Sequence, residues 1–244
     1  MKGGIELAAR PDTRPRHQQI AAELRAEIMS GILRAGEQLP STPHLVARFD
    51  AANATIQRAL QALKDEEYLR GHPGKGVYVQ DRKTLIVEAA PYKRPTPHGY
   101  SYELLQVGEV LPPNDIFAAL GLADGEKAVV RHRLLRHDGE PVELSWSYYP
   151  TGIASGSPLA GRKKIRGGAP RVLADLGYPQ RHFRDQISVR QPTTQEVQGL
   201  NLPADVPVFR QFRIIYSDAG LPVEASILIK GGHLYQLAYQ QAVE

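Results

Sequence analysis

The chain has 244 residues, enough for one or two globular domains with buried cores. Hydrophobic residues make up 42% of it and charged residues 23%, which excludes a disordered chain, a collagen and a coiled-coil rod. The net charge of +4 permits an anionic partner without requiring one. The chain has no cysteine, so disulfides, thiolate nucleophiles and cysteine metal sites are excluded.

Several other classes of protein lack support in the sequence. No apolar run approaches the roughly 20 residues that cross a bilayer, and residues 1–12 lack the apolar stretch of a signal peptide. We therefore expect a cytoplasmic protein without a membrane partner. The eight histidines show no metal-ligand spacing, and no nucleophile elbow or dinucleotide loop is present. We expect no catalytic residue, no cofactor and no metal.

A helix is predicted after Arg14, because apolar residues recur there at every fourth position and mark one face. These residues are Ile20, Leu24, Ile28 and Ile32. Glycines and Pro40 interrupt the pattern, and Ser41 is a good N-cap for a short second helix that ends near Phe49.

A third helix is predicted over residues 53–68, where apolar side chains have the i, i+3, i+4, i+7 spacing of a core-facing stripe. They are Ile56, Ala59, Leu60 and Leu63. A glycine-rich turn at residues 71–76 and a short strand at residues 77–79 follow. Three helices and a glycine-tipped hairpin predict a winged helix-turn-helix domain over residues 14–80.

The composition changes after this domain. Residues 81–98 are predicted to form a linker because they contain Pro91, Pro95 and Pro97. Residues 99–242 are predicted to form an α+β domain on an antiparallel sheet. Strands are expected at 128–135, 142–149, 186–189, 208–217 and 222–229, and helices at 113–120, 171–176 and 194–200.

Four motifs in the first domain keep a family-like order and spacing. They are Gln19-Ile20-Ala21, Gly31-Ile32-Leu33 with Gly36-Glu37-Gln38-Leu39-Pro40-Ser41, Ala54-Thr55-Ile56-Gln57-Arg58-Ala59-Leu60, and Gly74-Lys75-Gly76-Val77-Tyr78-Val79. With them the domain resembles the DNA-binding domain of the GntR family. The resemblance implies a sequence-specific DNA-binding transcriptional regulator.

Base contacts are expected near the start of the third helix, where Asn53 and Gln57 share a side. Such side chains can bind adenine bidentately, although Asn53 has an alternative role as the N-cap. Arg58 is expected on a phosphate or a guanine. Lys75 is expected to reach DNA from the wing tip, with a solvated lysine on a tight turn as the alternative. The expected DNA-binding residues are Ser41, Thr42, Arg48, Asn53, Ala54, Thr55, Gln57, Arg58, Lys75 and Gly76.

The chain departs from the family where relatives usually carry cations. Thr42-Pro43 stands in place of Glu-Arg, Ala52-Asn53 in place of Ser-Arg, and Gln57 in place of a frequent Arg. We therefore expect an operator other than the commonest one, and a lower intrinsic affinity for DNA.

The second domain carries a further set of motifs. They are Arg131-His132-Arg133, Asp138-Gly139-Glu140-Pro141-Val142, Ser147-Tyr148-Tyr149-Pro150, Asp218-Ala219-Gly220-Leu221-Pro222-Val223-Glu224, and Gly232 with Tyr235 to Tyr239. With them the domain resembles the UTRA effector-binding domain of the HutC subgroup, whose fold is similar to that of chorismate lyase. The resemblance implies a domain that binds a small effector and dimerises.

Arg131 and Arg133 alternate along a strand, so they share a face and suit a phosphate or carboxylate. Glu224 and Lys230 lie on the polar face of a later strand. The resemblance implies that the arginines line the effector pocket and that Glu224 binds ligand hydroxyl or amino groups. An exposed surface pair of arginines is the alternative. The expected effector-binding residues are Arg131, Arg133, Ser145, Ser147, Tyr148, Glu224 and Lys230.

The sequence therefore predicts a bacterial repressor that acts as a homodimer on a palindromic double-stranded DNA operator. A small anionic effector, such as a sugar phosphate or a carboxylate, is expected to release it. Two alternatives remain. One is a plasmid-transfer-type repressor without a metabolite effector, and the other is a chorismate-lyase-like enzyme whose Arg131, Arg133 and Glu224 hold a diacid. The basic run at residues 162–166 is expected to be a solvated loop.

Overall fold

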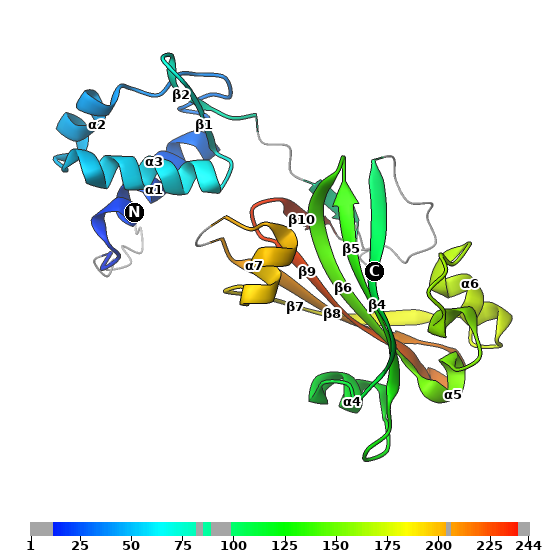
Figure 1. The fold of residues 1–244 in the computed structure, drawn as a ribbon. Helices are drawn as coiled ribbons and strands as arrows, with labels where there is room; N and C mark the ends of the chain where they lie inside the picture. Colours follow the sequence, from blue (N-terminus) through cyan, green and yellow to red (C-terminus); the bar gives the residue numbers. More distant parts are fainter. Residues whose placement is uncertain (1–11, 82–84, 89–98, 204–205, 239–244) are drawn as a thin grey trace, which may run out of the picture. The chain divides into compact units, whose positions relative to one another are not determined.

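The computed structural model divides the chain into two compact units, with the boundary between residues 83 and 84 (Figure 1). The structure describes residues 12–81, 85–88, 99–203 and 206–238, with backbone alone for 85–88.

Within residues 12–81, the first unit contains three helices and one hairpin, as the sequence predicted. The helices are α1 (Arg16–Met29), α2 (Thr42–Phe49) and α3 (Asn53–Asp65), and the hairpin strands are β1 (Leu69–His72) and β2 (Gly76–Val79). β1 and β2 pair antiparallel, and an isolated bridge joins Gln38 to Tyr78 of β2. The segment between α1 and α2 is thereby attached to the hairpin.

One hydrophobic core holds the first unit together. The predicted stripe on α3 is fully buried, as are Ile20 and Leu24 of α1. The prediction that Ile32 continues the α1 face is wrong, because α1 ends at Met29 and Gly31 then turns the chain with φ +78°. Ile32 is exposed as a result.

The second unit is built on a six-stranded antiparallel sheet with the order β4-β5-β6-β9-β8-β7, which confirms the predicted fold class. Its strands are β4 (Tyr100–Val110), β5 (Ala128–His137), β6 (Glu140–Pro150), β7 (His182–Arg190), β8 (Val208–Tyr216) and β9 (Pro222–Gly231). Its helices are α4 (Asn114–Leu120), α5 (Thr151–Ala154), α6 (Gly168–Asp175), α7 (Thr194–Leu200), and the 3₁₀ turns η1 (Pro158–Ala160) and η2 (Asp218–Gly220).

Apolar clusters form on both faces of this sheet, since successive side chains of a strand point to opposite faces. On one face, α4 and α7 cover apolar side chains of β5, β6, β8 and β9. On the other face, α5, η1 and α6 cover a third cluster at one end, which includes Val129 and Tyr149. The rest of that second face carries polar side chains, and the candidate effector site lies there.

The segment predicted as a linker contains a strand, so that prediction is wrong for part of its length. β3 (Leu85–Glu88) pairs in parallel with β10 (Tyr235–Ala238). The aliphatic run of residues 85–87 explains this, because branched aliphatic residues favour strands. The rest of the predicted linker from 82 to 98 lies outside the described residues, and so does Tyr239.

A candidate DNA interface and a buried polar layer

Helix α3 carries five of the ten residues predicted to bind DNA. Asn53, Ala54, Gln57 and Arg58 are exposed, and Thr55 is half-buried. Asn53 is the first residue of the helix, while Ala52 occupies the N-cap position, so the N-cap alternative for Asn53 is wrong. The side-chain amide of Asn53 therefore does not cap the helix, and it is available to a partner at the N-terminal end of α3.

The start of α2 lies beside this surface. Gln57 Nε2 donates a hydrogen bond to Thr42 Oγ1 at 3.1 Å, which joins the two helices through their polar side chains. Ser41 occupies the N-cap position of α2 but makes no capping hydrogen bond. Its Oγ instead lies 2.6 Å from Nδ1 of His44. The structure thus brings Thr42 and Gln57 together, as a shared binding surface requires.

Arg48 differs from the other predicted DNA contacts because it has a carboxylate partner. Its guanidinium pairs with Glu27 of α1 and stacks on the Phe49 ring at 4.7 Å. The hydrogen bond to Glu27 raises the pKa of Arg48. Because Glu27 offsets its charge, Arg48 is a weaker candidate for phosphate binding than the sequence suggested.

The wing tip presents Lys75 on a firmly held backbone. The Lys75 amide donates to His72 O, and its carbonyl accepts from Gln38 Nε2 at 2.8 Å and from the Tyr78 hydroxyl at 3.1 Å. Gly76 has φ +106°, and a Cβ there would lie 2.6 Å from Gln38 Nε2. The glycine lets the chain pass this close to Gln38, while the Lys75 side chain stays exposed.

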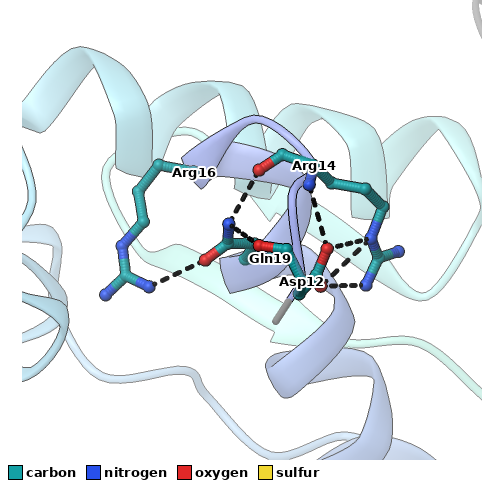
Figure 2. A network of polar contacts seen from close by, with 4 residues as sticks. All are labelled: Asp12, Arg14, Arg16 and Gln19. Carbon is teal, nitrogen blue, oxygen red and sulfur yellow. Dashed lines mark hydrogen bonds and ion pairs between the residues drawn. The ribbon is translucent and has the colours of Figure 1, made fainter. Parts of the chain in front are cut away.

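The first turn of α1 and the residues just before it form a polar network that the sequence reasoning missed (Figure 2). Gln19 Nε2 donates to the carbonyls of Asp12 and Arg14, and Arg14 pairs with the Asp12 carboxylate. That pair lowers the pKa of Asp12 to about 2. Arg16 donates to Gln19 Oε1 and also to the carbonyl of Phe49 on α2. The latter contact spans 33 positions, so local spacing in the sequence does not reveal it.

In the second unit, a polar row crosses five strands on one face of the sheet. The register places Arg131 beside Ser147, Ser147 beside Ser226, Ser226 beside Arg213, and Arg213 beside Asp185. Neighbouring pairs add the remaining members of this polar layer, which are Arg133, Glu143, Ser145, Gln211, Glu224 and Lys230. Apart from the half-buried Arg133 and Asp185, all of these side chains are buried.

The centre of the layer is a chain of hydrogen bonds between an arginine and a carboxylate. Arg133 Nη2 donates to Ser147 Oγ at 2.6 Å, Ser147 and Ser226 Oγ are 2.8 Å apart, and Ser226 Oγ lies 2.9 Å from Glu224 Oε1. Gln180 approaches the other Glu224 oxygen at 3.4 Å. Among the described residues, Glu224 has no cationic partner, although it is buried. Polar ligand groups that donate hydrogen bonds can therefore be recognised here.

Two predicted members of the effector site already have partners. Arg131 Nη1 donates to the carbonyls of Leu159 at 2.8 Å and Gly161 at 2.6 Å, which ties the η1 segment to β5. Burial lowers the pKa of Arg131. Lys230 Nζ lies 2.8 Å from Glu143 Oε2 and 5.5 Å from the centre of the Tyr235 ring. Arg131 is therefore already bonded to main-chain carbonyls, and Glu143 balances the charge of Lys230.

The prediction for Tyr148 is also wrong. Ser147 lies in the polar layer, so Tyr148 points to the opposite face of the sheet. There it packs with Ile116 of α4 and with Phe212, and burial raises its pKa. Ser145 and Ser147, by contrast, lie on the predicted face.

Sequence reasoning also missed several members of the layer. Arg213 makes two hydrogen bonds of 2.7 Å to Asp185, and Gln211 donates to the same carboxylate at 2.9 Å. Glu143 holds Lys230 from the neighbouring strand. The available signal was the alternation of Gln211 and Arg213 with apolar residues along β8, which is unusual for a buried strand.

Among the residues that the structure describes, no group of three or more His, Asp or Glu side chains is arranged to hold a metal ion. The helices in the described ranges include none that is long and apolar enough to cross a membrane.

Comparison with known proteins gives matches to both units. The model of the gntR family of bacterial regulatory proteins matches residues 16–79, and the UTRA domain model matches residues 97–236. An uncharacterised HTH-type transcriptional regulator of Streptomyces coelicolor is 28% identical over 92% of each chain. A protein of Escherichia coli K12 named "Probable transcriptional regulator PhnF" is 26% identical over 84% of this chain and 86% of that protein. A crystal structure of a GntR-family transcriptional regulator matches with a TM-score of 0.66 at 20% identity, over 95% of this chain and 99% of the other.

Proposed function

Because this chain belongs to the GntR family of bacterial regulatory proteins and carries a UTRA domain, we propose that it is a homodimeric repressor released from a palindromic operator by a small anionic effector. DNA-binding transcriptional regulation is the activity of that family. The proposal includes repression rather than activation, the homodimer, the class of effector and membership of the HutC subgroup. Residues 14–80 would bind DNA, and residues 99–242 would bind the effector and dimerise.

The proposed DNA contacts follow the exposed surface of the first unit. Asn53 and Gln57 would meet base edges, because the N-terminal end of a recognition helix enters the major groove. Thr42 supports this position through its hydrogen bond from Gln57. Lys75 would contact a phosphate or the minor groove from the wing. Two such units would bind half-sites about one helical turn apart.

The proposed effector site is the centre of the polar layer. The observation that carries it is the buried Glu224 carboxylate, which two serines connect to Arg133. We propose that the anionic group of the effector binds Arg133 and that its hydroxyl or amino group binds Glu224. Because Glu143 already balances the charge of Lys230, that lysine would shape the site rather than neutralise the effector. Arg131 would hold the η1 segment beside the site.

The proposed mechanism of release uses the strand that precedes the second sheet. β3 lies in the sequence between the DNA-binding residues and the polar layer, and it pairs with β10. β10 carries Tyr235, whose ring lies beside Lys230 in the layer. An effector that binds one arrangement of the polar layer better than another would shift β10 and β3. This shift would change the spacing between the DNA-binding domains of the two subunits.

An enzymatic role has less support. A chorismate-lyase-like site would need Arg131 to hold a carboxylate, but Arg131 donates to main-chain carbonyls. The relatives reported above are transcriptional regulators. We therefore propose no catalytic activity.

Electrophoretic mobility shifts with the purified protein test the proposal. We expect it to retard DNA from upstream of its own gene, with an affinity that falls steeply as salt rises. A thermal-shift screen of sugar phosphates, carboxylates and phosphonates should then find a compound that also weakens this complex. Equal binding to random duplexes would contradict recognition of a specific operator. A compound that tightens the protein–DNA complex would contradict release by an effector.

A further inference from the structure

Two neutral groups hold the guanidinium of Arg16, and Figure 2 shows one of them, the side-chain amide of Gln19. Its Nη1 donates to Gln19 Oε1 at 3.2 Å, and its Nη2 donates to the carbonyl of Phe49 at 2.8 Å. Gln19 is itself fixed by two main-chain carbonyls. A guanidinium has five N–H donors, so three remain for a further partner.

Arg16 differs in charge balance from the other arginines that make contacts in the first unit. Arg14 pairs with Asp12, Arg25 pairs with Glu66, and Arg48 pairs with Glu27. Between residues 12 and 81, no carboxylate lies within ion-pair distance of Arg16. The side chain is exposed. It therefore offers an uncompensated positive charge in a fixed position.

The contact with Phe49 places this charge near the start of α3. Phe49 is the last residue of α2, and Asp50 then turns the chain with φ +45°. Three residues separate Phe49 from Asn53, where α3 begins. The Arg16 guanidinium is therefore bonded to the chain just before the N-terminal end of α3, the end that would enter the major groove between the phosphates that border it.

We propose that Arg16 binds a DNA phosphate beside the major groove that α3 enters. This contact supplies a positive charge that Pro43, Asn53 and Gln57 do not. The planar guanidinium suits the phosphate oxygens, and its two intramolecular hydrogen bonds reduce the entropy lost on binding. The inference rests on the proposed role of α3 as the recognition helix.

The test compares full-length wild type with Arg16→Ala, Arg16→Lys and Arg25→Ala. The probes are a duplex selected by the wild-type protein from a randomised pool and a scrambled duplex of equal length. Dissociation constants are measured between about 50 and 200 mM salt. Melting temperatures of the free proteins show whether each variant folds. Arg25 is the matched control, since it lies on the same helix but pairs with Glu66.

We expect Arg16→Ala to weaken binding to both duplexes by a similar factor, about tenfold for each subunit. The slope of log affinity against log salt should fall by about one for each subunit, because one phosphate contact is lost. Arg16→Lys should keep the wild-type slope, because it keeps the charge. Arg25→Ala should also keep that slope, whatever it does to the melting temperature.

An unchanged salt slope in Arg16→Ala overturns the proposal. If affinity and melting temperature then fall together, Arg16 only fastens α1 to α2. Gln57→Ala in the same assay distinguishes a failure of the phosphate contact from a failure of the recognition-helix assignment. Loss of discrimination by Gln57→Ala, with an unchanged slope for Arg16→Ala, overturns the phosphate contact alone. Unchanged discrimination by Gln57→Ala overturns the recognition-helix assignment, and this proposal with it.

Discussion

The two units place the polar residues of their candidate sites in opposite environments. In the first unit, Asn53, Gln57 and Lys75 are exposed. In the second, residues such as Glu143 and Lys230 are buried and hold each other in pairs. The exposed groups can bind an extended anionic partner without losing internal contacts, whereas the buried groups need their partners in order to stay folded.

This difference predicts how substitutions in the two units divide between stability and binding. Removing one member of a buried ion pair leaves an uncompensated charge in a poorly solvated site, which is costly for folding. Removing an exposed polar group leaves water in its place, so the loss is seen in the complex with DNA. The predictions below sharpen or break this contrast, from the largest expected effect to the smallest.

The largest effect is expected for Glu143→Ala. The side chain of Lys230 is only 2% exposed, so its ammonium would lose its carboxylate partner without gaining solvent. We expect the free energy of unfolding of the second unit to fall by about 3–5 kcal/mol. Urea denaturation followed by the fluorescence of Trp146, the single tryptophan of the chain, measures this.

The double variant Glu143→Leu/Lys230→Met provides the control. It removes both charges and fills a similar volume, so most of the lost stability should return. If the double variant is as unstable as Glu143→Ala, the loss comes from packing rather than from the buried charge.

A somewhat smaller loss of stability is expected when low pH protonates His132. The ring of His132 stacks on that of Trp146, with 4.3 Å between the ring centres. Burial, and then the charge of Arg133, lower the pKa of His132 from 6.5 to about 4. Between these values the unfolded chain binds a proton that the folded chain does not. The stability of the second unit should therefore be complete above about pH 6.5 and fall by up to about 3 kcal/mol toward pH 4.

His132→Phe should flatten this dependence, because phenylalanine keeps the stacking and cannot bind a proton. Urea midpoints at about pH 7 and about pH 5 for both proteins isolate the contribution of His132 from that of the carboxylates. Parallel pH profiles for the two proteins would contradict the assignment.

The next effect concerns the effector. A compound from the thermal-shift screen should stabilise the wild type by about 2.7 kcal/mol at a hundredfold excess over its Kd. Arg133→Ala should abolish this gain, because it removes the proposed anion contact, and should leave binding to the selected duplex unchanged. Tyr148→Phe should keep the full gain, because Tyr148 lies on the opposite face of the sheet. An unchanged gain in Arg133→Ala would place the ligand elsewhere.

The parts of the fold that depend on local spacing could be predicted from the sequence. The stripe of Ile56, Ala59, Leu60 and Leu63 fixed the buried face of α3, because helical periodicity alone decides it. β4 was missed because it is an edge strand whose apolar residues do not alternate cleanly. The strand β3 was hidden in a proline-containing segment, since its partner β10 is distant in sequence.

The candidate site shows the same limit. The shared face of Arg131, Arg133, Ser145 and Ser147 follows from the two-residue period of a strand. That period also places Tyr148 on the opposite face, but the family motif grouped it with its neighbours. The pairing of Lys230 with Glu143 depends on the register between β6 and β9, which no local pattern fixes.

The smallest effect is expected in the first unit, for Gln57→Ala. The side chain is exposed, so the variant should unfold like the wild type. It should lose about 1–3 kcal/mol of binding to the selected duplex and relax the preference at one base pair, because a bidentate base contact is lost. Gln61→Ala is the matched control, since Gln61 lies one turn further along the same exposed side and bonds to Asp65. Competition with single-base variants of the duplex measures both. If the two variants lose equal affinity and neither relaxes a base preference, this exposed surface does not read the operator. The two units would then differ in the burial of their polar residues but not in the way those residues bind a partner.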